Sequence, residues 1–204
     1  MTDKNQKSNV PVRTVYFNGE IVGEIPITGN DEEDLAASRR LLESKGLNQK
    51  MSLEQVMYNQ AFAFAKTSAQ LYDQGLKKVP RDGQLVIPWI VNSAFAIEIY
   101  LKTLGQMSGR PSRGHNISDL YSGLPDDARA SILAEIPNAL RDRNFTSEFD
   151  ITAVISALNK AFVEWRYHYE VQRLPAIPIE ATIVLMKVVH QVCAEKLKKI
   201  VSEP

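Results

Sequence analysis

The chain has 204 residues and a mass of 22.9 kDa, which is enough for one substantial domain or for a domain with a small appendage. Its 44% hydrophobic and 24% charged residues are typical of a globular protein. The 24 Lys and Arg residues balance the 24 Asp and Glu residues, which argues against a nonspecific binder of nucleic acid or anionic membrane, because such proteins carry a basic excess. A local basic patch is compatible with this balance.

The single cysteine, Cys193, excludes an intramolecular disulfide and a Cys-rich metal site. The first ten residues are polar, and no uninterrupted apolar run approaches the roughly 18 residues of a membrane span. We therefore expect a cytoplasmic protein that needs no membrane and no cofactor.

Residues 12–27 predict a β-hairpin, because the Asn-Gly dipeptide at 18–19 is a strong signal for a two-residue turn. A regular hairpin around that turn would place Val15 opposite Val22. An isolated hairpin is marginally stable in water, so this one is expected to pack against another element.

Capping residues and Gly or Pro stops divide the rest of the chain into helices. The helices are expected over 31–45, 52–75, 85–107, 117–120, 125–136, 150–169 and 179–201. The predicted fold is all-α, a bundle of about five main helices with a small N-terminal β-hairpin. The expected organisation is a flexible N-terminus at 1–11, a hairpin and first helix as an appendage at 12–50, and the bundle at 51–204.

The helix expected over 85–107 is apolar on nearly every side, which marks it as central. Glu98 and Lys102 lie four residues apart within its apolar arc, and they need either each other or a third partner. In the helix over 150–169, Arg166 lies at the edge of the apolar stripe and Glu170 one turn beyond. We expect a network of these four charges, with a salt bridge between Glu98 and Arg166. It would either fix the register of two helices or form a groove in which Arg166 holds an anion.

Between those helices, Arg110, Arg113 and His115 precede a short helix. They predict either a phosphate site or a solvated loop in which His115 caps or packs. A metal centre in a helical bundle would need Glu-x-x-His motifs on two helices, and no histidine here has a Glu three residues before it. We expect no metal site.

Three segments together resemble a divergent branch of the HEPN superfamily, the higher-eukaryote and prokaryote nucleotide-binding helical bundles. They are NSAFAIEIYLKTL at 92–104, GHNISDLYSGLP at 114–125 and FVEWRYHYE at 162–170. The resemblance covers about half of the chain, within residues 87–201. It implies a dimeric helical bundle that binds or cleaves RNA in phage defence or toxin–antitoxin regulation.

Active members of that superfamily cleave RNA without metal, using an Arg and a His one to two turns apart on one helix. Arg166 is at the position of that arginine, but Glu170, Val171 and Gln172 stand where the histidine would be. Our first hypothesis is a non-catalytic module that binds RNA, a nucleotide or a partner protein. Its binding residues would be Arg110, Arg113, Lys102, Tyr169 and Glu170.

The alternative hypothesis is a metal-independent endoribonuclease. In it, His115 is the general acid or base, Arg166 stabilises the phosphorane, and Glu98 orients one of them.

A homodimer is also expected, because a central helix that is apolar on nearly every side needs cover that few helices can supply. The hairpin also offers an unpaired edge, which proteins normally cover. The helix carrying Arg166, or the loop at 110–115, would lie near the interface. The alternative is a monomer in which the hairpin folds over the bundle.

Overall fold

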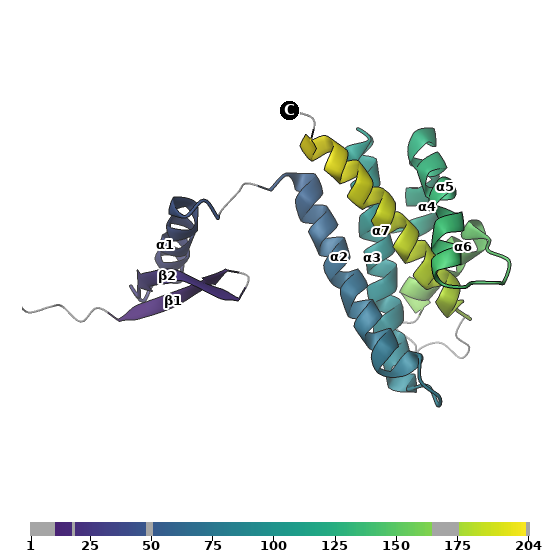
Figure 1. Ribbon diagram of the computed structural model, residues 1–204, viewed down its shortest axis with the longest axis horizontal. Helices are drawn as coiled ribbons and strands as arrows, with labels where there is room; N and C mark the ends of the chain where they lie inside the picture. The colour runs from purple at the N-terminus through teal and green to yellow at the C-terminus, as the bar shows by residue number, and fades with distance from the viewer. Residues whose placement is uncertain (1–10, 18, 48–50, 165–175, 203–204) are drawn as a thin grey trace, which may run out of the picture. The chain divides into compact units, whose positions relative to one another are not determined.

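The computed structural model describes residues 11–17, 19–47, 51–164 and 176–202, and of residues 160–164 and 201–202 it describes the helical backbone alone. The chain divides into two compact units, Met1–Met51 and Ser52–Pro204. The first contains a hairpin and one helix, and the second is a helical bundle (Figure 1). The predicted fold class, an all-α bundle with a small N-terminal hairpin, is confirmed.

The first unit consists of β1 (Val12–Phe17), β2 (Glu20–Pro26) and α1 (Asp31–Ser44). The predicted pairing of Val15 with Val22 is wrong by one residue, because a bulge beside Tyr16 places Val15 opposite Gly23. A β-bulge leaves one residue unpaired and turns the following side chains to the other face. As a result Val15 and Ile25 are both buried, whereas Tyr16 is exposed.

Hydrogen bonds connect the first turn of helix α1 to the residue Thr28, which follows the hairpin. The side chain of Asn30 caps the helix by accepting from the backbone amides of Glu32 and Glu33. Asp34 is buried and accepts from both the amide and the hydroxyl of Thr28, each at 2.9 Å. These hydrogen bonds to the charged carboxylate lower the pKa of Asp34.

The second unit begins with α2, which opens with a capping box formed by Ser52 and Gln55. Its helices are α2 (Leu53–Leu71), α3 (Val86–Met107), α4 (Ile117–Ser122), α5 (Asp126–Asp142), α6 (Ile151–Glu164) and α7 (Ile179–Ser202). A π-helical turn, Tyr72–Leu76, and a 3₁₀ turn, Gly83–Leu85, connect α2 to α3.

The expectation that α5 ends before Pro137 is wrong. The helix continues through Pro137 to Asp142. A proline inside a helix removes one hydrogen bond and costs roughly 3 kcal/mol. Ile132 and Ala139, on either side of it, are fully buried in the core, and this burial offsets the cost.

Helix α3 is the centre of the bundle and packs against α2, α4, α6 and α7. Trp89, Ile97 and Tyr100 on this helix are fully buried. By length and composition, the segment Gly83–Met107 could cross a membrane, but half of its most apolar window is buried inside the bundle. Its central position in the core accounts for the apolar composition.

Candidate functional site

The candidate site is built around a buried carboxylate in the middle of α3. Glu98 is only 3% exposed. One of its oxygens, Oε1, accepts a hydrogen bond from Lys102 Nζ at 2.7 Å and lies 2.9 Å from His115 Nδ1. Lys102 comes from the next turn of the same helix, whereas His115 comes from the loop after it. The buried charge therefore has two partners, as low-dielectric surroundings require.

His115 reaches Glu98 because the chain turns back along α3 after the helix ends. The amide of Arg110 donates to the carbonyl of Gly105 at 2.9 Å. A Cβ atom at Gly105 would lie 2.7 Å from the carbonyl oxygen of Arg110, so only glycine allows this close approach. Glu98 precedes Gly105 by seven residues, which is about 10 Å along a helix axis. The segment 108–116 thus follows α3 back from its end.

Helices α4 and α6 hold the other end of this segment. Asn116 caps α4 by accepting from the amide of Asp119 at 3.1 Å. The next amide, that of Ile117, donates to the side chain of Asn159 on α6 at 2.8 Å, and Ile117 itself is fully buried. His115 is therefore attached to a fixed helix start rather than to a free loop.

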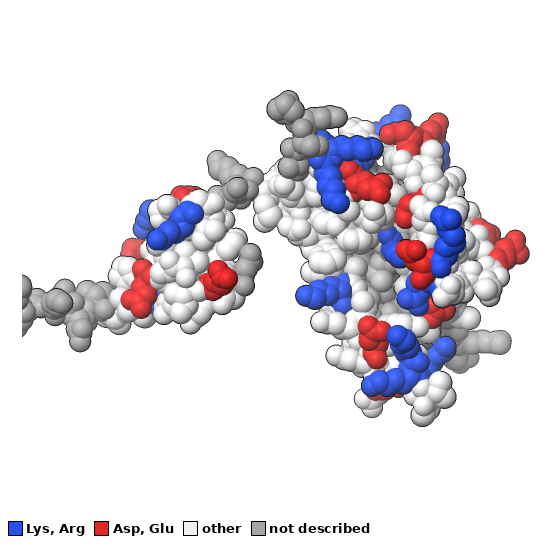
Figure 2. Space-filling view, viewed as in Figure 1, with Lys and Arg blue, Asp and Glu red and all other residues white. Residues whose placement is uncertain are grey.

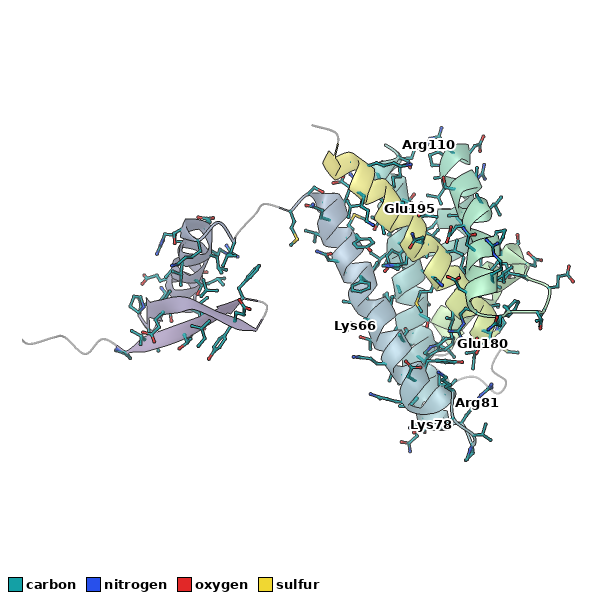
Figure 3. All side chains as sticks on the ribbon, viewed as in Figure 1. Lys66, Lys78, Arg81, Arg110, Glu180 and Glu195 are labelled. Atoms are coloured by element: carbon teal, nitrogen blue, oxygen red, sulfur yellow. The ribbon has the colours of Figure 1, made fainter. Side chains whose placement is uncertain are left out.

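The arrangement leaves the other edge of the imidazole in water, since the His115 side chain is 75% exposed. A carboxylate can only accept, so His115 Nδ1 carries the hydrogen in this contact and Nε2 is left as an acceptor or as the carrier of a second proton. Arg110 and Arg113 are also exposed, and the segment 108–116 contains no acidic residue. Arg110 lies at the end of the bundle where α3 terminates (Figure 3).

Three of the expected site residues, Arg166, Tyr169 and Glu170, lie outside the described residues. The salt bridge between Glu98 and Arg166 therefore stays a prediction. The second oxygen of Glu98, Oε2, is buried and has no hydrogen-bond partner among the described residues.

The structure thus brings Glu98, Lys102 and His115 into contact and places Arg110 farther along α3. Sequence reasoning missed two residues that position them, Gly105 and Asn159. A glycine near the end of an apolar helix signals a close approach, but nothing in the sequence distinguishes Asn159 from any other polar residue of its helix.

Within the described ranges, no three His, Cys, Asp or Glu side chains are grouped as metal ligands. Comparisons of the chain with protein-family models, with curated proteins and with solved structures found no match.

Proposed function

We propose that the bundle is a HEPN-like module that binds RNA, without cleaving it, along the surface formed by segment 108–116 and Lys102. The observation that carries the proposal is the contact between buried Glu98 and exposed His115. It holds the imidazole in place at one end of a segment that contains Arg110 and Arg113 and no acidic residue. The resemblance of residues 92–104 and 114–125 to the HEPN superfamily supports the same interpretation.

The path of segment 108–116 along α3 favours an extended polyanion over a single nucleotide. A site for one phosphate needs several donors that converge on one point. Here the backbone of Arg110 contacts Gly105 and His115 contacts Glu98, so the segment extends for about 10 Å along α3. Cations distributed along a line are suited to successive phosphates of one strand.

A second candidate function, a metal-independent endoribonuclease, is favoured by the geometry of His115. The carboxylate of Glu98 accepts a hydrogen bond from His115 Nδ1–H and leaves Nε2 exposed. Such a contact orients an imidazole that acts as a general acid or base. In this mechanism His115 transfers the proton, Glu98 orients the His115 ring, and Arg166 stabilises the phosphorane.

Binding is tested by fluorescence polarisation of a labelled single-stranded RNA with the full chain at two salt concentrations. We expect the double variant Arg110→Ala/Arg113→Ala to bind at least about tenfold more weakly, with a smaller salt dependence. The matched control is Lys78→Ala/Arg81→Ala, which removes two cations from the opposite end of the bundle (Figure 3). Equal losses in both double variants, or no binding by the wild type, would overturn the proposal.

Incubation of the same RNA in EDTA separates the two functions. Intact RNA after prolonged incubation supports binding alone. Cleavage by the wild type that disappears in His115→Ala would replace our proposal with the endoribonuclease.

A further inference from the structure

A groove lies between α2 and α7, on residues that the RNA proposal does not use. Its volume is about 380 Å³, within the range of small-molecule sites. The short side chains of Ala65 and Ala69 leave the α2 side open, and the rings of Phe62 and His190 stack at one end with their centroids 5.4 Å apart. The complete lining is Phe62, Ala65, Lys66 and Ala69 from α2 and Ile183, Met186, Lys187 and His190 from α7.

The charged residues of this lining are two lysines. Lys66 is exposed, lies in the second half of α2 (Figure 3), and has no hydrogen bond or ion pair with any described residue. Lys187 forms an ion pair with Asp142, which is outside the lining. The surface around Lys66 on α2 is mostly uncharged (Figure 2). The groove is therefore apolar with an unneutralised positive charge at its edge.

His190 adds a neutral hydrogen-bond donor to the wall. Its Nδ1 lies 2.7 Å from the hydroxyl of Tyr100, which is fully buried. Burial raises the pKa of Tyr100, so this hydroxyl keeps its proton, and the hydroxyl of Tyr58 lies 3.5 Å from the same nitrogen. With two hydroxyls facing Nδ1, we assign Nδ1 as the acceptor and Tyr100 as its donor. The hydrogen of the neutral imidazole is then on Nε2, for which the described part of the chain offers no acceptor.

A second cavity of about 100 Å³ lies beside the groove and shares the lining residues Ala69, Ile183 and Met186 with it. Trp89 and Arg143 line this second cavity, and their Nε1 and Nε atoms are buried without a hydrogen-bond partner in the described residues. Asp73 is the one carboxylate in the lining of this second cavity. It is exposed, and its Oδ1 lies 3.9 Å from Lys77 Nζ. The two unpaired buried polar atoms that belong to the lining of this second cavity are thus nitrogen donors.

We propose that this groove binds a small-molecule carboxylate with an apolar body, of the class of medium-chain fatty acids. The carboxylate accepts from Lys66 Nζ and from His190 Nε2. The apolar chain lies within the groove, along Ala69, Ile183 and Met186. An apolar lining with donors and a free cation is complementary to such an anion and disfavours an apolar amine.

The test is calorimetric titration of the full chain with decanoate, and with decanol as the uncharged ligand of equal length. We expect saturable one-to-one binding of decanoate in the micromolar range, about tenfold weaker binding of decanol, and a similar weakening in Lys66→Ala. Lys78→Ala, which removes a lysine outside the groove, should bind decanoate as the wild type does.

A pair of bulky substitutions on α2 locates the ligand. Ala69→Trp fills the groove and should abolish binding, whereas Ala63→Trp, at an exposed position outside the lining, should leave it unchanged. Thermal unfolding of both variants verifies that they are folded. The proposal is overturned if decanoate shows no saturable binding up to about 1 mM, if decanol binds equally well, or if the two tryptophan variants behave alike.

Discussion

At the scale of single residues, Glu98 shows how a buried charge is tolerated in an apolar helix. One oxygen interacts with both Lys102 and His115, and both partners extend toward water, with side-chain exposures of 19% and 75%. The carboxylate is thus buried, while Lys102 reaches solvent in part and His115 over most of its side chain. Because only the carboxylate is fully buried, the desolvation free energy of the ion pair is smaller than that of a pair buried on both sides.

The variant Glu98→Ala should lower the free energy of unfolding by about 2 kcal/mol, measured by urea denaturation of the full chain. A fully buried pair that loses one partner costs about 3–5 kcal/mol, and here Lys102 can turn toward solvent, which reduces the loss. Glu98→Gln keeps an acceptor for Lys102 and should lose less. A loss below about 0.5 kcal/mol in Glu98→Ala would show that the carboxylate does not stabilise the fold.

The burial of His190 leads us to expect that the free energy of unfolding depends on pH. Burial lowers its pKa below the ordinary value of 6.5, so the unfolded chain binds a proton at a higher pH than the folded chain does. The stability contributed by neutral His190 is complete above pH 6.5 and is lost as the pH falls toward the lowered pKa. Urea denaturation between about pH 7.5 and 5 should show this decline, and His190→Phe should flatten it. An equal slope in the variant would contradict the prediction.

At the scale of elements, the path of segment 108–116 depends on one glycine. Gly105→Ala would place a Cβ atom 2.7 Å from the backbone oxygen of Arg110, and a backbone atom cannot move aside as a flexible side chain does. We expect a loss of about 1–3 kcal/mol in unfolding free energy and a shifted NMR signal of the His115 ring. The control is Gly83→Ala, because no atom lies within 4 Å of a Cβ there. Comparable losses in both variants would contradict this account.

The elements differ in how far local sequence determines them. Asn30 and Ser52 predict the starts of α1 and α2 correctly, because capping depends on residues within one turn. The bulge beside Tyr16 and the passage of α5 through Pro137 were not predicted, because packing against distant residues decides both. The same limit applies to the site. The polar pair Glu98 and Lys102 is visible as helical spacing, but the contact with His115 depends on the path of the loop.

At the scale of the whole molecule, the expected homodimer remains a prediction. Light scattering at micromolar concentration should give twice the chain mass of 22.9 kDa. Helix α3 is covered by α2, α4, α6 and α7 of its own chain, so its apolar composition does not require a partner. The prediction rests on the hairpin, whose two described strands pair with each other and leave their outer edges unpaired, and on C₂ dimers being the commonest soluble oligomers. A mass equal to that of one chain, unchanged on tenfold concentration, would show that the protein is a monomer.

The central claim, that RNA binds along segment 108–116, is tested most directly by photo-crosslinking. Single-stranded RNA is crosslinked to the full chain, and the attached peptides are identified by mass spectrometry. Our account predicts crosslinks to the peptides that contain Arg110–His115, and their loss in the Arg110→Ala/Arg113→Ala variant. Crosslinks confined to the hairpin unit, or to the loop that contains Lys78 and Arg81, would contradict it.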